Sequence, residues 1–152
     1  MSGRAGTRLV SLLGDGPAGL DTCVFIYFVE EHPRYLPLIE PLFERVDSGR
    51  LRAFSSALTL LETLVVPFRA GNAVLGEQYE HLLTSSRGLT LVEIDRAQLR
   101  AAAQLRARTG MKAPDALQVA AALGNNCSHF VTNDRRLPPV PGLTVVLLSD
   151  LV

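Results

Sequence analysis

Two carboxylates in the sequence lie within strongly apolar stretches, where an ionised side chain is costly. Glu62 lies inside the run 58–66, which otherwise consists of leucine, valine and threonine, and Asp115 precedes the apolar, alanine-rich run 116–122. A buried carboxylate is stable only when it is paired, hydrogen-bonded or bound to a cation. Carboxylates in such surroundings are typical of acid–base and metal chemistry, so both residues are candidates for a functional site.

Two aspartates occur where expected strands end. The run Leu20–Val29 is rich in β-branched and aromatic residues, and Glu30–Pro33 interrupt it. We expect a strand that turns into a helix in this region, with Asp21 at the end of the strand. Asp134 follows an apolar strand expected over His129–Thr132. Ligands of open parallel sheets bind at the carboxyl ends of the strands. Asp21 and Asp134 therefore join the candidate site.

Four converging carboxylates repel one another, so a positive charge is needed to hold them together. Lys112 is the only lysine, and His32, His81 and His129 lack the spacing of a zinc site. Mg²⁺ and Mn²⁺ are hard ions that accept oxygen ligands from a few carboxylates and keep positions for substrate phosphate. The sequence therefore predicts an acidic pocket for Mg²⁺ or Mn²⁺, built from these four carboxylates.

Each of the four residues also has a purely structural interpretation. Asp115 follows Pro114 and could stabilise a helix N-terminus through the helix dipole. Asp134 could belong to a turn, and Asp21 could cap a helix. Glu62 could extend its carboxylate into solvent while its stem lies on apolar surface. The sequence leaves these alternatives open for each residue taken singly.

Helical and strand-like segments alternate along the chain, and the strands are apolar on both faces. Helices are expected at 38–46, from a cap at Ser56 or Thr59 through Glu62 to about 68, and at 74–83, 97–108 and 115–123. Further strands are expected at 51–55, 89–94 and 143–148. Strands that are buried on both faces are typical of parallel sheets covered by helices. The expected fold class is therefore α/β, with a parallel sheet between two helical layers.

Composition limits the function classes further. The chain has 152 residues, a formal net charge of zero and two cysteines, Cys23 and Cys127. One domain with reduced thiols is expected, and a broad polycationic surface that binds any nucleic acid is excluded. No apolar run is long enough to cross a bilayer, and 1–19 lacks the apolar core of a secretory signal. We therefore expect a cytoplasmic protein.

An ordered set of segments indicates a family. The segments are Leu20–Tyr27, Ser56–Glu62, Pro114–Leu117 with the alanines that follow, and Val131–Leu137. In order and spacing they resemble the PIN-domain ribonucleases of the VapC toxin type over roughly 20–152. The resemblance implies a single PIN-like α/β domain over 20–152, with a mostly parallel sheet of about five strands and helices on both faces. Residues 1–19 are expected to form an N-terminal arm or a short helix.

The resemblance also assigns roles to individual residues. By position, all four carboxylates are implied as catalytic residues and metal ligands. Asp21 and Asp115 are the firmest ligands, and Glu62 and Asp134 complete the acidic quartet directly or through water. Cys23 departs from the asparagine or serine common at that position, which weakens the expected hydrogen bonding on the substrate side. Two hydroxyls that orient the carboxylates and two arginines that could grip flanking phosphates complete the candidate set: Thr22, Thr132, Arg135 and Arg136.

The function implied is that of a Mg²⁺- or Mn²⁺-dependent endoribonuclease, which hydrolyses RNA without a covalent enzyme intermediate. Such a protein resembles the toxin of a VapBC-type toxin–antitoxin pair. The expected partners are an RNA substrate, a VapB-like antitoxin and a second copy in a homodimer, with no membrane. The helices at 38–46 and 60–68 could dock the antitoxin, although their apolar stripes could equally belong to the core.

Other functions remain open at this point. A free-standing PIN-like RNA-processing enzyme or a non-catalytic interaction module would share the same fold. A magnesium-dependent phosphatase with Asp21 as nucleophile is a further alternative, but the companion aspartate two residues later is absent, because Cys23 and Val24 follow.

Overall fold

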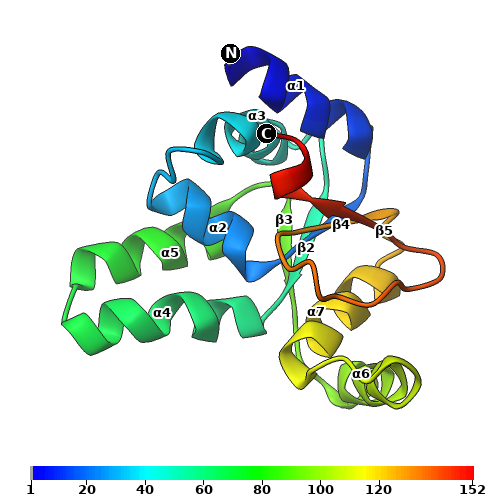
Figure 1. The fold of residues 1–152 in the computed structure, drawn as a ribbon. Helices are drawn as coiled ribbons and strands as arrows, with labels where there is room; N and C mark the ends of the chain where they lie inside the picture. The colour runs from blue at the N-terminus through cyan, green and yellow to red at the C-terminus, as the bar shows by residue number, and fades with distance from the viewer. Residues whose placement is uncertain (1) are drawn as a thin grey trace.

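The architecture is a five-stranded parallel sheet with helices on both faces. The computed structural model describes the backbone of residues 2–152 and the side chains of residues 7–152. The strand order is β3-β2-β1-β4-β5, and every neighbouring pair is parallel (Figure 1). The strands are β1 Ala18–Leu20, β2 Ala53–Ser56, β3 Leu89–Val92, β4 His129–Thr132 and β5 Thr144–Leu147. The α/β class expected from the sequence is confirmed, and all carboxyl ends lie at one edge.

Helices occupy nearly all of the connections between the strands. They are α1 Ser2–Leu13, α2 Thr22–Val29, α3 Leu36–Asp47, α4 Leu58–Ala70, α5 Ala73–Ser85, α6 Arg96–Thr109 and α7 Ala113–Gly124, with a short 3₁₀ helix η1 at Leu148–Asp150. In Figure 1, α2, α3 and α5 lie on one side of the sheet, and α6 and α7 lie on the other. None of these helices, within residues 2–152, is long and apolar enough to span a membrane, as the sequence predicted.

Alternate strand residues face two separate cores. Ala18 and Leu20 of β1 and Val131 of β4 pack into the core formed with α1, α2 and α3. Phe54 of β2 and Phe130 of β4 point the other way, into the core formed with α6 and α7. This alternation follows from the two-residue period of a strand. Both faces of the sheet are therefore buried, which explains why its strands read as continuous apolar runs.

Gly19 allows the helix that carries Asp115 to approach the central strand closely. A Cβ atom at Gly19 would lie 2.8 Å from the Cβ of Ala122 in α7 and 3.0 Å from the ring of Phe130. Neither distance is compatible with a normal van der Waals contact. The absence of a side chain at Gly19 thus sets the separation between α7 and β1.

The run Leu20–Val29, expected to be a strand that turns into a helix, is almost entirely helical. The strand ends at Leu20, and Thr22–Val29 forms helix α2, which begins after Asp21 as its N-cap. A larger strand part was expected because the run is rich in β-branched and aromatic residues. A short, continuously apolar run does not distinguish a buried strand from a buried helix. In this chain, the capping carboxylate and tertiary packing outweigh β-propensity.

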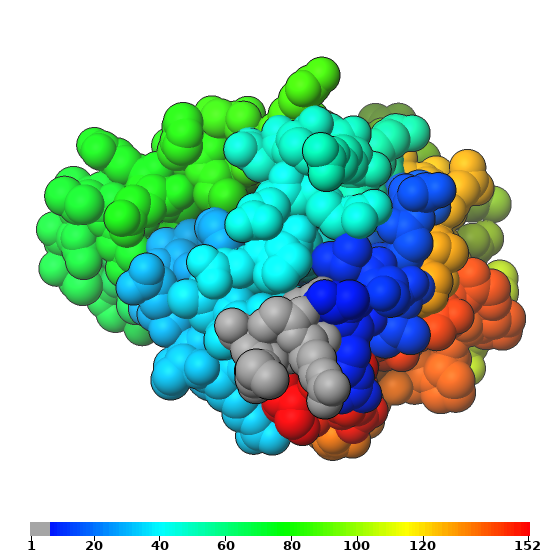
Figure 2. All heavy atoms as spheres, turned by 90° about the horizontal axis from the view of Figure 1, so that it is seen from above, coloured from blue at the N-terminus to red at the C-terminus, as the bar shows by residue number. Residues whose placement is uncertain are grey.

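The segment before β1 contributes to the core. Leu9 and Leu13 of α1 are buried together with Leu38 and Leu42 of α3. Figure 2 shows α1 in blue lying alongside α3 in cyan, with the C-terminal residues in red close by. Arg8 in α1 donates a hydrogen bond to the carbonyl oxygen of Leu151 at 3.1 Å. Helix α1 therefore packs against both α3 and the C-terminal end of the chain.

Candidate active site

Asp21 lies directly after the central strand and serves as the N-cap of α2. Its Oδ1 accepts a hydrogen bond from the backbone N–H of Thr22 at 2.8 Å, and its Oδ2 accepts one from the Thr132 hydroxyl at 2.7 Å. Burial raises the pKa of Asp21, and the charges of Glu62 and Asp134 raise it further, while the two hydrogen bonds oppose this rise. The structure thus holds a carboxylate in a place that disfavours its charge.

Glu62 is carried by α4, whose apolar residues gave no obvious solvent face. Its side chain is half-buried, and its Oε1 accepts a hydrogen bond from the hydroxyl of Thr22 at 2.7 Å. Glu62 therefore points toward the end of β1 and the start of α2, and its charge reaches Asp21. This contact argues against the alternative left open by the sequence, in which the Glu62 carboxylate extends into solvent.

Asp115 lies in the first turn of α7, the position that also suits the helix dipole. Burial is the main cause that raises the pKa of its carboxyl group, and the charges of Asp21 and Asp134 add to it. Lys112 and Arg136 act in the opposite direction. Although the helix terminus and two cations favour the charge, the net pKa of Asp115 is still raised, because burial, together with the two acidic neighbours, outweighs them.

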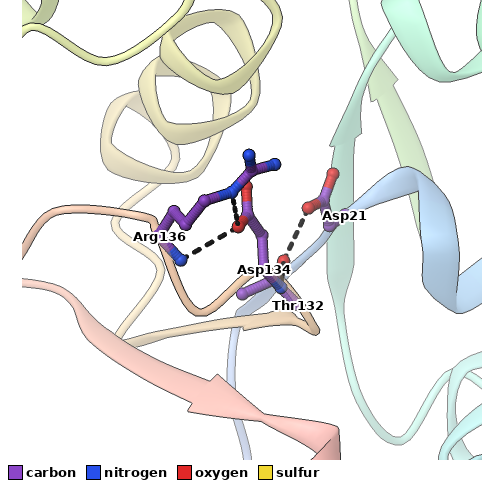
Figure 3. Close-up of polar contacts among 4 residues, drawn as sticks. All are labelled: Asp21, Thr132, Asp134 and Arg136. Carbon is purple, nitrogen blue, oxygen red and sulfur yellow. Dashed lines mark hydrogen bonds and ion pairs between the residues drawn. The ribbon is translucent and has the colours of Figure 1, made fainter.

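Asp134 follows β4 and is partly neutralised by its own loop. Its Oδ1 accepts hydrogen bonds from the backbone N–H of Arg136 at 2.9 Å and from the Arg136 Nε at 3.4 Å. Figure 3 shows the Arg136 side chain against the Asp134 carboxylate, close to the hydrogen bond between Thr132 and Asp21. Arg135 points elsewhere and pairs with Asp150. Of the two arginines, Arg136 is therefore the one beside the carboxylates.

All four predicted carboxylates are found at the carboxyl edge of the sheet, but they are not equally close. Asp21 interacts electrostatically with Glu62 and Asp134, and Asp115 interacts with Asp21 and Asp134. A pocket of about 250 Å³ has Asp115, Asp134 and Arg136 in its lining. Neither Asp21 nor Glu62 lines this pocket, and Asp21 is the residue that interacts electrostatically with both Glu62 and the pocket carboxylates.

The donor set suits a hard cation, although the described residues do not form a ready ligand cage. In the part of the chain described by the structure, no three His, Cys, Asp or Glu side chains are placed so that they could hold a metal ion together. The oxygens of Asp21 and one oxygen each of Glu62 and Asp134 accept hydrogen bonds from protein donors instead. Carboxylate oxygens are nevertheless the ligands that Mg²⁺ and Mn²⁺ prefer.

Several polar residues beneath the carboxylates were not identified from the sequence. Gln118 and Thr59 are buried and hydrogen-bond to one another at 2.7 Å. Asn133 donates to the Tyr27 hydroxyl at 3.3 Å and accepts from the backbone N–H of Ser149 at 3.0 Å. A glutamine within an apolar, alanine-rich helix was the available signal for Gln118.

The Cys23 thiol is not a nucleophile in this structure. Burial and the charge of Asp21 raise its pKa to about 12. At neutral pH a thiol of this pKa is almost entirely protonated and unreactive. The reduced thiol expected from the sequence agrees with this environment.

Comparison with known families places the chain. The family model of the PIN domain matches residues 19–143, which include all four carboxylates. The chain belongs to the PIN-domain family. PIN domains form a nuclease family, so the general activity indicated is that of a hydrolase acting on nucleic acid. The family resemblance noted in the sequence is confirmed at this level.

Solved structures with this PIN fold include chains of toxin–antitoxin complexes. A chain of a toxin–antitoxin complex from Klebsiella pneumoniae has a TM-score of 0.62 at 16% identity and covers 84% of this chain and 95% of that chain. A chain of DNA-bound VapBC from Salmonella typhimurium has a TM-score of 0.61 at 19% identity, and the match covers 87% of this chain and 98% of that chain. VapBC2 from Rickettsia felis, bound to a promoter DNA fragment, gives 0.59 at 20% identity, with 86% and 97% covered. No curated protein matches the sequence.

Proposed function

We propose that this PIN-domain protein is a divalent-metal-dependent endoribonuclease and the VapC-type toxin of a toxin–antitoxin pair. The observation that carries the proposal is the placement of four carboxylates at one edge of the sheet, two of them with raised pKa values. Such a charge cluster is stabilised by a bound cation and is typical of phosphodiester hydrolysis. The similar structures are of a toxin–antitoxin complex and of two VapBC proteins, which supports the toxin assignment.

The proposed roles of the four carboxylates and of Thr132 follow from their positions. Asp21 and Asp115 would hold the cation, with Glu62 and Asp134 beside them directly or through water. A bound Mg²⁺ or Mn²⁺ supplies Lewis-acid activation of the attacking water and the scissile phosphate. Thr132 fixes Asp21 through a donated hydrogen bond at 2.7 Å. The four carboxylates titrate as a group, so proton acceptance is assigned to the group and not to one member.

Arg136 is the better candidate for binding substrate phosphate. It is exposed at the pocket and contacts Asp134 through a long, weak ion pair at 3.4 Å. A phosphate group could replace this contact, because guanidinium groups bind phosphate with two parallel hydrogen bonds. Arg135 is held by Asp150 and Ser149, so it would have to leave these partners to act on the substrate.

The nuclease assignment predicts cleavage of single-stranded RNA only when a divalent ion is present. Labelled RNA and DNA oligonucleotides of the same sequences are incubated with Mn²⁺, with Mg²⁺ and with EDTA, and the products are resolved by electrophoresis. We expect RNA products with either metal, none with EDTA, and at least about 100-fold slower cleavage by Asp115→Asn, more than the loss of a supporting residue causes. Equal cleavage by Asp115→Asn would contradict the assignment of Asp115 to the metal site, and cleavage of DNA alone would contradict the RNA assignment.

A groove between α2, α3 and α5 is the proposed docking surface for the antitoxin. Its volume is about 620 Å³. Its floor includes Phe28, Phe43 and Leu82, and its rim carries four carboxylates: Glu31, Glu40, Glu44 and Asp47. No lysine or arginine is part of this lining. Apolar floor and acidic rim together fit an amphipathic segment that presents arginine or lysine along its edge.

The two helices proposed from the sequence as docking surfaces differ in the structure. Leu38, Leu42 and Val46 of α3 are in the core, and the side of this helix that carries Glu40, Phe43 and Glu44 meets the groove. Helix α4 instead exposes four large apolar side chains: Leu61, Val65, Val66 and Phe68. Exposed apolar patches mark interaction sites, and the expected homodimer, which stays a prediction, has these side chains available.

Charge reversal in the groove tests the docking surface. Glu40→Arg combined with Glu44→Arg changes two exposed rim positions, whereas Glu77→Arg with Glu80→Arg makes the same change on α5 outside the groove. The probe is a fluorescein-labelled amphipathic peptide of leucine and arginine, followed by anisotropy. We expect the groove variant to lose at least about tenfold in affinity and the control variant to change little. Equal losses in both variants would mean that the peptide senses only the net charge.

A further inference from the structure

A buried polar network lies directly beneath the carboxylates, and Gln118 is at its centre. Gln118 is on α7, one helical turn after Asp115, and its side chain is only 2% exposed. Its Oε1 accepts a hydrogen bond from the backbone N–H of Ser56 at 3.0 Å, and its Nε2 donates to the hydroxyl of Thr59 at 2.7 Å and to that of Thr22 at 3.3 Å. A glutamine so deeply buried is retained only if its amide is satisfied.

The contacts determine which way the amide faces. The backbone N–H of Ser56 is a donor only, so the oxygen of Gln118 must face it. The amide nitrogen of Gln118 consequently faces Thr59 and Thr22 and offers one hydrogen to each. The orientation of Gln118 is therefore fixed by a main-chain group at the end of β2.

The direction of the hydroxyl hydrogens follows from the same reasoning. Ser55 donates to the carbonyl oxygen of Leu20 at 2.8 Å, so its oxygen is free to accept from Thr59 at 2.7 Å. Thr59 then has no hydrogen left for Thr22, and the Thr22 oxygen accepts from Gln118 instead. The single hydrogen of Thr22 is left for Glu62, whose Oε1 lies 2.7 Å away.

We propose that Gln118 is a positioning residue of the active site, which acts through the Thr22 hydroxyl to hold the Glu62 carboxylate beside Asp21. This inference rests on the proposed nuclease function for its catalytic consequence, but the positioning itself depends only on the hydrogen bonds of this chain. Gln118 links α7, which carries Asp115, to α4, which carries Glu62. The network thus couples the two ends of the acidic cluster.

The first test is structural and needs no activity. Gln118→Met keeps the length and approximate volume of the side chain and removes both polar atoms of its amide, the oxygen and the nitrogen. In a crystal structure of this variant, we expect the Thr22 hydroxyl to turn and the contact between Thr22 and Glu62 to be lost. Retention of this contact at 2.7 Å would overturn the proposal, whatever the protein is found to cleave.

The second test measures Mn²⁺ binding without substrate in a double-mutant cycle. Gln118→Met, Thr22→Val and the double variant are compared by electron paramagnetic resonance, and kcat and KM are then determined with RNA. If Gln118 acts through Thr22, each single variant weakens Mn²⁺ binding by about 10- to 100-fold, and the double variant is no weaker than Thr22→Val alone. The loss then falls on kcat and not on KM.

The outcomes separate the two hypotheses. Additive losses in the double variant would assign Gln118 a general structural role and overturn the positioning role. If the wild-type chain neither binds Mn²⁺ nor cuts RNA, the proposed function fails, while the crystal structure of Gln118→Met still decides whether Gln118 holds Glu62. Loss of the Thr22–Glu62 contact in Gln118→Met, together with non-additive losses of Mn²⁺ affinity in the double-mutant cycle, supports both the positioning role and the proposed function.

Discussion

Asp21→Asn is expected to abolish RNA cleavage while leaving the protein folded and, without metal, at least as stable as the wild type. Asparagine caps a helix about as well as aspartate, so the start of α2 is kept. The hydroxyl of Thr132 can turn to accept from the new amide group, because hydroxyls both donate and accept. What is lost is a charge that burial and two acidic neighbours disfavour, and with it the central ligand of the cluster. We expect a fall of more than the roughly 100-fold associated with supporting residues.

The chain contains a matched control for this substitution. Asp95 is also a helix N-cap, and its carboxylate accepts from the backbone N–H of Gln98 at 2.9 Å. It is exposed and does not contribute to the raised pKa of Asp21 or of Asp115. Asp95→Asn should leave both cleavage and the melting temperature close to those of the wild type. Full activity in Asp21→Asn would refute the proposed site, and unfolding of Asp21→Asn alone would show that its carboxylate is needed for the fold.

Divalent metal is expected to stabilise the protein strongly, and more so as the pH rises. At a concentration 100 times its dissociation constant, a ligand specific for the folded state contributes about 2.7 kcal/mol. In a domain of this size, that corresponds to a rise in melting temperature of roughly 5 to 10 °C. Differential scanning fluorimetry with Mn²⁺, Mg²⁺ and EDTA measures this shift.

The sign of the pH dependence follows from the raised pKa values. For Asp21 and Asp115, the folded state binds more protons than the unfolded chain between pH 3.8, the ordinary pKa, and the higher folded pKa. Their contribution to the stability of the metal-free protein therefore falls as the pH rises through this window. Metal binding requires the ionised carboxylates, so the stabilisation by Mn²⁺ grows over the same range.

Comparison with Asp21→Asn isolates this effect from other titrating groups. The difference in stability between the metal-free wild type and the variant should become less favourable to the wild type as the pH increases from about 4 towards neutrality. The variant should show little of the Mn²⁺-induced shift. A wild-type melting temperature that ignores both Mn²⁺ and EDTA at pH 7.5 would contradict the metal-dependent hypothesis.

The sequence sufficed to place the acidic residues because their positions depend on local signals. Pro114 and the alanines after Asp115 indicate a helix start, and the apolar run before Asp134 indicates a strand end, so topology alone brings the two to one edge. The convergence of Glu62 on this edge was a hypothesis based on its apolar neighbours. The structure adds its contact with Thr22.

Other features could not be predicted because they depend on contacts between distant segments. The helix at Thr22–Val29 is specified by burial and by its Asp21 cap, and a propensity-based reading favoured a strand. Gln118 is a single polar residue in an apolar helical segment, and its partners Ser56 and Thr59 are far away in sequence. Only the folded arrangement shows that these side chains satisfy one another.

The use of one carboxylate both to begin a helix and to serve the reaction restricts how this protein can change over evolutionary time. Asp21 starts α2, and α2 packs its buried side chains into the larger core. Most replacements at this position would weaken folding and chemistry together, so inactive descendants would tend to be lost as unstable chains. Asparagine keeps the helix cap but removes the carboxylate, so this substitution separates the structural role from the catalytic one. A lineage that abandons cleavage but keeps the fold, for instance as a binding module, is therefore expected to carry asparagine here.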